Sequence, residues 1–267
     1  ATLLVKNRDP DAIFAMLASD HIIHDTARFQ ADLNVAFEAA ESEQALVTIG
    51  IKPTNPATGY GYIQKGKVER EISGKKIYQV TRFVEKPNLK TAEAYLKSGE
   101  YYWNASMFVW QVPVITNALA VHRPQLWDVF KEIDQRLAKG DELDPLLDEY
   151  YPKIEKISID YAVMEKAENV KTVPVQMGWS DVGGYRALHQ LLTEDETTNY
   201  TSGPVFTTES EGLYVRSEGP AIAVNGVSDL VKSSGRNSLP YAIISFLAAR
   251  SSSSASETFC VFILAIK

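Results

Sequence analysis

Apolar runs alternate with amphipathic stretches through the first 200 residues of the chain. Short apolar runs rich in β-branched and aromatic residues predict strands, and apolar residues three or four positions apart predict helices. Residues 25–42 show the helical spacing, and Thr26 is placed to cap that helix. Strands are predicted at 11–18, 45–51, 61–64, 76–85, 105–112 and 169–177, and further helices at 88–99, 113–122, 124–140, 158–167 and 180–195.

The order of these elements indicates the fold class and a change along the chain. Strands alternating with helices are typical of an α/β sheet with crossover connections. After about Gly203 the pattern turns to short strands, and the last 36 residues, from Lys232, are Ser-rich with a single acid, Glu257. We therefore expect a domain at 1–200, a short β segment at 201–231, and an atypical tail at 232–267 of foreign or frameshifted character.

Composition narrows the functional classes. The chain has 267 residues, 45% hydrophobic and 23% charged, which suits a globular protein with a sizeable core. A formal net charge of −7 without a basic tract argues against a general nucleic-acid binder. The apolar runs are shorter than the ~20 residues of a membrane helix, and no signal-peptide pattern is seen. With one cysteine, Cys260, no disulfide framework is possible, so a cytoplasmic setting is expected.

Several polar residues stand beside the predicted strands. In an open α/β sheet, ligands bind at the carboxyl ends of strands, so these residues would converge if the strands are parallel neighbours. Two aspartates could hold Mg²⁺, a lysine could meet a phosphate, and a glutamate and an asparagine could bind hydroxyls, a combination that suits a sugar phosphate. The residues are Asp20, Glu85, Lys86, Asn104 and Asp181.

Each of these residues also has a simpler explanation. Asp20 and Asp181 could each cap the helix that follows. Glu85 and Lys86 could be ordinary surface charge, and Asn104 could be a turn residue. The histidines near Asp20 have no third nitrogen or sulfur ligand nearby, which argues against a zinc site.

Six segments together carry a family resemblance: LASDHII, GIKPTNPATGYGYI, RFVEKPN, YYWNASMFVW, SIDYAVMEK and GWSDVGGYRAL. In this order and spacing they resemble the bacterial mannose-1-phosphate guanylyltransferases, including the type fused to a mannose-6-phosphate isomerase domain. The resemblance runs over about residues 8–231. It implies a Rossmann-like nucleotidyltransferase sheet flanked by helices and followed by a few short strands.

The resemblance also implies a reaction and residue roles. Mannose 1-phosphate would attack GTP in line to give GDP-mannose and pyrophosphate, with no covalent enzyme intermediate. Asp20 and Asp181 would hold Mg²⁺ against the phosphates, and Lys86 would clamp the sugar phosphate. Glu85 and Asn104 would bind mannose hydroxyls.

The Gly61 backbone would lie against the sugar, again by resemblance. One family segment is not matched: the Gly-rich stretch GGxGxRLxPLSR, which cradles the triphosphate. Impaired catalysis by this chain alone is therefore expected. Two alternatives stay open, a non-catalytic remnant or association module and a hexose-1-phosphate uridylyl- or thymidylyltransferase. The family is also compatible with a homodimer.

Overall fold

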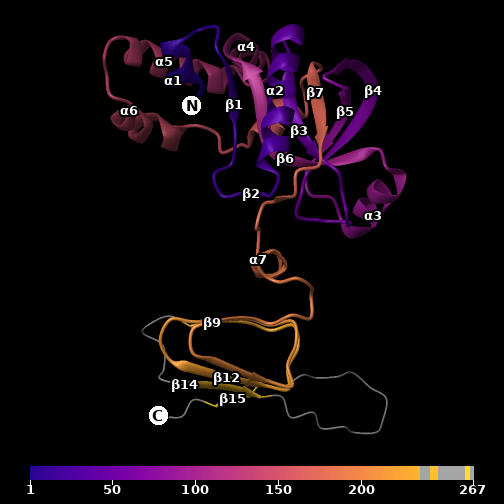
Figure 1. Ribbon diagram of the computed structural model, residues 1–267. Helices are drawn as coiled ribbons and strands as arrows, with labels where there is room; N and C mark the ends of the chain where they lie inside the picture. Colours follow the sequence, from indigo (N-terminus) through magenta and orange to yellow (C-terminus); the bar gives the residue numbers. More distant parts are fainter. Residues whose placement is uncertain (235–240, 246–261, 265–267) are drawn as a thin grey trace. The chain divides into compact units, whose positions relative to one another are not determined.

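The computed structural model describes residues 1–234, 241–245 and 262–264 (Figure 1). The chain separates into two compact units, Ala1–Asp181 and Val182–Lys267, and each is described by itself. Much of the predicted tail at 232–267 lies outside the described residues. Within the described parts, no helix has both the length and the apolar content needed to cross a bilayer.

A six-stranded mixed sheet forms the centre of the first unit. Its strands are β1 (Ile13–Met16), β3 (Leu46–Ile51), β4 (Tyr62–Ile72), β5 (Lys75–Val84), β6 (Tyr101–Gln111) and β7 (Val170–Val175). They follow the order β1-β6-β3-β7-β5-β4, and β4 also pairs with the start of β6. β3 and β7 are parallel, whereas the other pairs are antiparallel. The α/β class expected from the sequence is confirmed.

Helices flank this sheet. They are α1 (Thr2–Arg8), α2 (Thr26–Glu43), α3 (Leu89–Ser98), α4 (Val112–His122), α5 (Pro124–Ala138), α6 (Leu143–Tyr150), the 3₁₀ turn η1 (Tyr151–Lys153) and the π-helix η2 (Asp160–Met164). The predicted end of α3 at Gly99 is confirmed, because Gly99 has the left-handed φ of 68°. The expected cap of α2 is wrong: Asp25, not Thr26, accepts a hydrogen bond from the Arg28 N–H, at 2.9 Å. The sequence pattern did not reveal α1 or α6.

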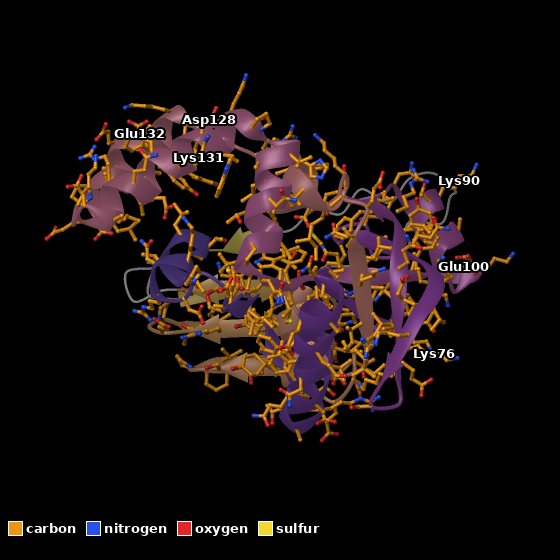
Figure 2. The ribbon with its side chains drawn as sticks, turned by 90° about the horizontal axis from the view of Figure 1, so that it is seen from above. Lys76, Lys90, Glu100, Asp128, Lys131 and Glu132 are labelled. Carbon is orange, nitrogen blue, oxygen red and sulfur yellow. The ribbon has the colours of Figure 1, made fainter. Side chains whose placement is uncertain are left out.

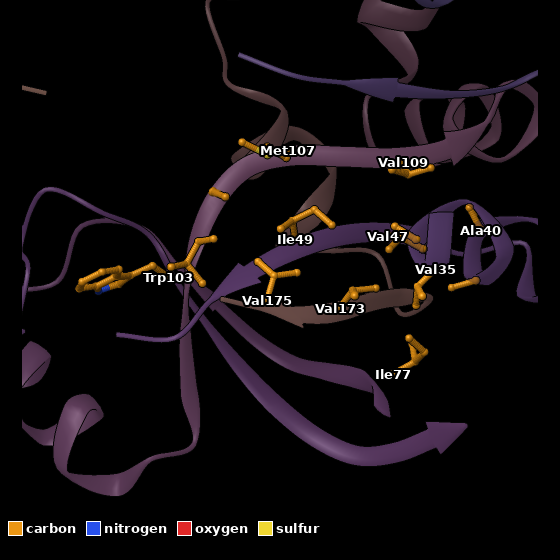
Figure 3. Packing of buried hydrophobic residues seen from close by; sticks show 14 of the residues in the cluster. Val35, Ala40, Val47, Ile49, Ile77, Trp103, Met107, Val109, Val173 and Val175 are labelled. Atoms are coloured by element: carbon orange, nitrogen blue, oxygen red, sulfur yellow. The ribbon is translucent and has the colours of Figure 1, made fainter. Parts of the chain in front are cut away.

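The central strands are buried on both faces because their side chains alternate between two cores. On one face, apolar residues of β3, β6 and β7 pack against α2; they include Val47, Ile49, Met107, Val109, Val173 and Val175 (Figure 3). On the other face, Leu46, Phe108 and Trp110 pack with residues of α4 and η2. This alternation explains why β3 and β7 appear in the sequence as continuous apolar runs.

The first strand departs from its prediction. A buried strand was expected at 11–18, but β1 covers four residues and is only partly buried. Met16 and Leu17 are 38% and 42% exposed. The reason is position: β1 stands at the end of the strand order, with β6 as its one described partner.

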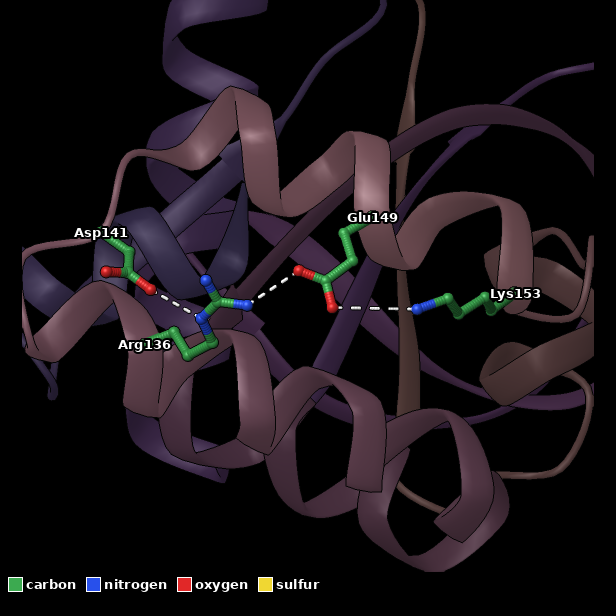
Figure 4. Close-up of polar contacts among 4 residues, drawn as sticks. All are labelled: Arg136, Asp141, Glu149 and Lys153. Atoms are coloured by element: carbon green, nitrogen blue, oxygen red, sulfur yellow. Dashed lines mark hydrogen bonds and ion pairs between the residues drawn. The ribbon is translucent and has the colours of Figure 1, made fainter.

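The helices α5 and α6 form a layer joined by apolar and ionic contacts. Ile133, Leu146 and Tyr150 make a small buried core between them. On the surface, Arg136 pairs with Asp141 at 2.6 Å and with Glu149 at 2.8 Å, and Lys153 extends the network (Figure 4). Such exposed pairs each contribute about 0–1 kcal/mol, so the apolar core matters more. Asp128, Lys131 and Glu132 on α5 are exposed and point outward (Figure 2).

In its described residues, the second unit has one helix followed by a coil of short strands. These are α7 (Tyr185–Leu192), β9 (Tyr200–Ser202), β10 (Val205–Thr208), β11 (Tyr214–Ser217), β12 (Ala221–Asn225), β13 (Val231–Ser234), β14 (Tyr241–Ser245) and β15 (Phe262–Leu264). The chain alternates between two sheets, β13-β11-β9 and β10-β12-β14-β15, whose neighbours run parallel except β14 and β15. Leu213, Val215, Ile222 and Val224 form its core. The short strands expected after about Gly203 correspond to β10, β11 and β12.

Candidate active site

Strand register brings together Gly61, Glu85 and Asn104. β4 pairs with β5 and with β6 in a register that puts Gly61 opposite Glu85 on one side and Asn104 on the other. The Asn104 backbone N–H donates to the Gly61 carbonyl oxygen at 2.8 Å. The assumption of parallel neighbouring strands is wrong here, because β4 is antiparallel to both partners. The three residues nevertheless lie side by side.

Close packing explains the glycine. A Cβ placed on Gly61 would lie 2.6 Å from Glu85 Oε2 and 3.3 Å from Asn104 Cβ. With a side chain at residue 61, the Glu85 carboxylate would have to move away from this backbone and Asn104 would be crowded. Gly59, two residues earlier, would place a Cβ in open space.

Asn104 is held by hydrogen bonds on both ends of its amide. The residue is 6% exposed, and Oδ1 accepts from the Ser106 backbone N–H at 3.0 Å and from Thr48 Oγ1 at 3.4 Å. Nδ2 donates to Asp160 Oδ1 at 3.0 Å. The interpretation of Asn104 as a turn residue before a strand is wrong, because it lies within β6, beside the irregularity between Thr48 and Gly50 in the pairing of β3 with β6.

Sequence reasoning missed Asp160 as a site residue. It begins η2 and forms part of a group of carboxylates with Glu85 and Glu165. Burial, followed by the charge of Glu85, raises the pKa of Asp160. Burial and then the charges of Asp160 and Glu85 raise the pKa of Glu165. The signal was available in SIDYAVMEK, where an acid begins an otherwise apolar helix.

Lys86 adds a cation at the edge of this group. Its Nζ lies 3.1 Å from Glu85 Oε1, and its side chain is 65% exposed against 17% for Glu85. Its backbone is left-handed, with φ 42°. A non-glycine residue in this conformation is uncommon and is found preferentially at functional sites. Glu85 is thus more enclosed than a surface charge, whereas Lys86 reaches into solvent.

A two-stranded ribbon joins the segments that carry Asp20 and Asp181. The strands β2 (Ile22–Ile23) and β8 (Trp179–Ser180) pair antiparallel, which sets the residues before β2 beside those after β8. The alternative explanation of both aspartates as helix caps is wrong, because Asp25 precedes α2 and Gly184 precedes α7. Asp20 is exposed and Asp181 is half-buried.

Tyr60, also missed from the sequence, connects the two groups of residues. Its hydroxyl donates to Asp181 Oδ1 at 2.8 Å, and burial, reinforced by this carboxylate, raises the pKa of the phenol. Its ring packs edge-on against Trp103 and Trp179, with centroids 5.0 and 5.4 Å apart. The Trp179 indole N–H in turn donates to His21 Nδ1 at 3.1 Å. Tyr60 immediately precedes Gly61, so one loop contacts both groups.

The donor set fits a magnesium ion that arrives with phosphate ligands. Mg²⁺ is usually held by one or two carboxylates and completes its shell with substrate phosphates and water. Asp20 and Asp181 would supply two carboxylates, and the second one accepts a hydrogen bond from the Tyr60 hydroxyl. Among the residues that the structure describes, no group of three or more His, Cys, Asp or Glu side chains could hold a metal by itself.

Comparison with known proteins identifies the family to which this chain belongs. The family model of the nucleotidyl transferases matches residues 1–198, and the chain belongs to that family. More particularly, it is similar to mannose-1-phosphate guanylyltransferases of Escherichia coli, at 36% identity over 233 residues, and of Klebsiella pneumoniae, at 38% over 231 residues. Each alignment covers 86% of this chain. It covers 50% of the Escherichia coli protein and 49% of the Klebsiella pneumoniae protein.

A solved structure agrees in fold. The crystal structure of mannose-1-phosphate geranyltransferase from Thermus thermophilus superposes on this chain with a TM-score of 0.72 at 28% identity. The superposition covers 99% of this chain and 68% of that one. The nucleotidyltransferase fold expected from the sequence is thereby confirmed. The chain spans about half the length of the curated relatives it matches.

Proposed function

We propose that this chain carries the sugar-phosphate site of a mannose-1-phosphate guanylyltransferase. In the proposed reaction a phosphate oxygen of mannose 1-phosphate attacks the α-phosphorus of GTP. The bond from that phosphorus to the oxygen bridging toward the β-phosphorus breaks, and pyrophosphate leaves as GDP-mannose forms. A cytoplasmic location and a homodimer stay predictions from the sequence.

The observation that carries the proposal is the packing of Gly61 between Glu85 and Asn104. A bare backbone with a carboxylate on one side and an amide on the other can accept the flat edge of a sugar ring and bind its hydroxyls. The family match and the relatives at 36% and 38% identity support a hexose 1-phosphate as the ligand.

The charged residues suit the phosphate part of the reaction. Lys86, exposed beside Glu85, would bind the phosphate of the sugar as a point charge. Asp20 and Asp181 would hold Mg²⁺, which would neutralise negative charge on the transferring phosphoryl group. Positioning is the main requirement of such a transfer, because no side chain has to form a bond to substrate.

Calorimetric titration of the chain with hexose phosphates tests the proposal. We expect saturable binding of mannose 1-phosphate and much weaker binding of mannose 6-phosphate, whose phosphate is at the wrong end of the sugar. Tighter binding of glucose 1-phosphate would instead favour the related uridylyl- or thymidylyltransferases. Absence of binding to either 1-phosphate would contradict a sugar-phosphate site.

A further inference from the structure

The two ends of the Asn104 amide have fixed and different partners. The Ser106 backbone N–H can only donate, and it lies 3.0 Å from Oδ1. The Asp160 carboxylate, when ionised, can only accept, and it lies 3.0 Å from Nδ2. Turning the amide over would set two donors together at one end and two oxygens together at the other. The surroundings therefore allow one orientation of the amide.

This orientation leaves one amide hydrogen without an acceptor among the described residues. Nδ2 has two hydrogens, and Asp160 accepts one of them. Nδ2 lies 3.6 Å from the point where a Gly61 Cβ would be, and Glu85 Oε2 lies 2.6 Å from the same point. A hydrogen-bond donor and an acceptor thus border the same space above the Gly61 backbone.

We propose that Asp160 is a positioning residue that holds the Asn104 amide so that an N–H faces the hexose beside the Glu85 carboxylate. One sugar hydroxyl can then accept from Asn104 and donate to Glu85 at the same time. With the amide reversed, both groups would be acceptors, and the hydroxyl, with its one hydrogen, could satisfy only one of them. This inference rests on the proposed function.

The surroundings of Asp160 suit this role. Asp160 begins η2, where Ser158 and its own backbone N–H favour the ionised carboxylate and lower its pKa against the effect of burial. Its other charged neighbours are Glu85 and Glu165, both acids, so the donors that hold it are uncharged. Asp160 makes a hydrogen bond to the Asn104 amide, so its effect on the sugar would pass through Asn104.

Nuclear magnetic resonance of the ligand-free chain tests the positioning directly. In the unmodified chain we expect the two side-chain amide protons of Asn104 to give well-separated signals that exchange slowly with water. Asp160→Ala removes the acceptor and should move these signals toward those of an exposed asparagine. Asp160→Asn keeps an oxygen acceptor, because the Ser158 hydroxyl can turn to accept, and should largely restore them.

Glu165→Gln is the matched control. It removes a negative charge from the same group of carboxylates but leaves the contact between Asn104 and Asp160 in place, so the amide signals should stay unchanged. Unchanged Asn104 signals in Asp160→Ala would overturn the proposal. A shift of equal size in Glu165→Gln would also overturn it, because a general effect of charge would then explain the result.

Binding supplies the second measurement. We expect Asp160→Ala to weaken mannose 1-phosphate binding about three- to tenfold, the usual effect of losing one hydrogen-bonding group. In the double variant with Asn104→Ala, affinity should equal that of Asn104→Ala alone, because Asp160 has nothing left to position. If the affinity losses of the two single variants multiply in the double variant, Asp160 acts independently of Asn104, and the proposal is overturned.

The two measurements separate the inference from the proposed function. If the unmodified chain does not bind mannose 1-phosphate while the Asn104 signals respond to Asp160→Ala as expected, the proposed substrate is wrong and the positioning stands. If mannose 1-phosphate binds and the Asn104 signals do not respond, the substrate stands and the positioning is wrong. Should Asp160→Ala fail to fold, Asp160→Ser provides the same loss of the carboxylate with a smaller cavity.

Discussion

Lys86 shows at the scale of one residue how a site can retain backbone strain. Its φ of 42° is left-handed, a conformation that costs a non-glycine residue of the order of 1–2 kcal/mol. The side chain is 65% exposed, so burial of its stem does little to offset that cost. Contact between the Lys86 ammonium group and a substrate phosphate would explain why a lysine, and not a glycine, is found at this position.

Replacing Lys86 with glycine separates these two contributions. Lys86→Gly should leave the free energy of unfolding unchanged or raise it by up to about 1 kcal/mol, because glycine adopts a positive φ freely. The same change should weaken mannose 1-phosphate binding about tenfold, the size expected for a charge-assisted hydrogen bond. Chemical denaturation and calorimetry measure the two effects.

Lys90→Ala, at an exposed position four residues further on (Figure 2), is the control for lost positive charge. Its affinity for mannose 1-phosphate should stay within about twofold of the unmodified chain. Equal losses in the two variants would show that Lys86 acts only through net charge.

Asp160 gives a pH-dependent prediction. Burial raises its pKa in the folded chain above the unfolded value, so the native state binds this proton more tightly than the unfolded state. The ionised carboxylate therefore costs stability at neutral pH, and the cost falls as the pH drops through the raised pKa toward about 3.9, the unfolded value. Asp160→Asn should be more stable than the unmodified chain at pH 7.

The advantage of Asp160→Asn should shrink steadily as the pH falls through that window. Urea unfolding of both chains at a series of pH values measures the difference. A difference that grew toward acid would mean that the carboxylate is stabilising when ionised, which is opposite to the sign expected from its burial.

At the scale of elements, the short β2–β8 ribbon and the loop before β4 hold the segments that carry Asp20 and Asp181. β2 and β8 contain two residues each, too few to be rigid by their ladder alone. The Tyr60 hydroxyl bond to Asp181 and the packing of its ring against Trp179 connect the loop before β4 to this ribbon. Removal of the hydroxyl should therefore loosen Asp181 while leaving the ring contacts intact.

Tyr60→Phe tests this at the proposed metal site. Hydrogen bonds that orient a metal ligand typically account for about ten- to a hundredfold in metal affinity. Mg²⁺ binding in the presence of mannose 1-phosphate should therefore weaken by about tenfold or more. Tyr151→Phe, which removes a hydroxyl from a tyrosine 67% exposed, should have no effect. Equal Mg²⁺ affinity in Tyr60→Phe and the unmodified chain would show that Asp181 does not depend on Tyr60.

The elements also show what the sequence could and could not predict. Glu85 and Lys86 were found because a β-branched run ends in charge before Pro87, which is a local pattern. Their meeting with Gly61 and Asn104 depends on antiparallel pairings of β4 with β5 and with β6, and no local pattern encodes that register. Asp160 and Tyr60 were missed because their roles come from contacts with residues 56 and 121 positions away.

At the scale of the whole molecule, the residues proposed for the sugar site all belong to the unit Ala1–Asp181. The second unit has its own core of Leu213, Val215, Ile222 and Val224 within a parallel coil of strands. The sequence pattern predicted short strands in this unit. It did not predict that they wind into a parallel coil, because parallel pairing between successive turns is non-local. Damage to this core should therefore leave the sugar site functional.

Ile222→Ala tests the independence of the two units. Ile222 is fully buried, so its truncation should cost about 2–5 kcal/mol of stability within the second unit. Proteolysis should then occur sooner within Val182–Lys267, while mannose 1-phosphate affinity stays within about twofold. A parallel loss of affinity would show that the second unit contributes to the site.

We propose that the sugar ring lies against the bare backbone of Gly61 between Glu85 and Asn104. Gly61→Ala puts a methyl group into that space, whereas Gly59→Ala puts the same group into open space. Calorimetric titration of mannose 1-phosphate into both variants is the most direct test. We expect binding to weaken about tenfold or more in Gly61→Ala, a loss of about 1.4 kcal/mol or more, and to stay unchanged in Gly59→Ala. Equal affinity in the two variants, with both folded, would contradict it.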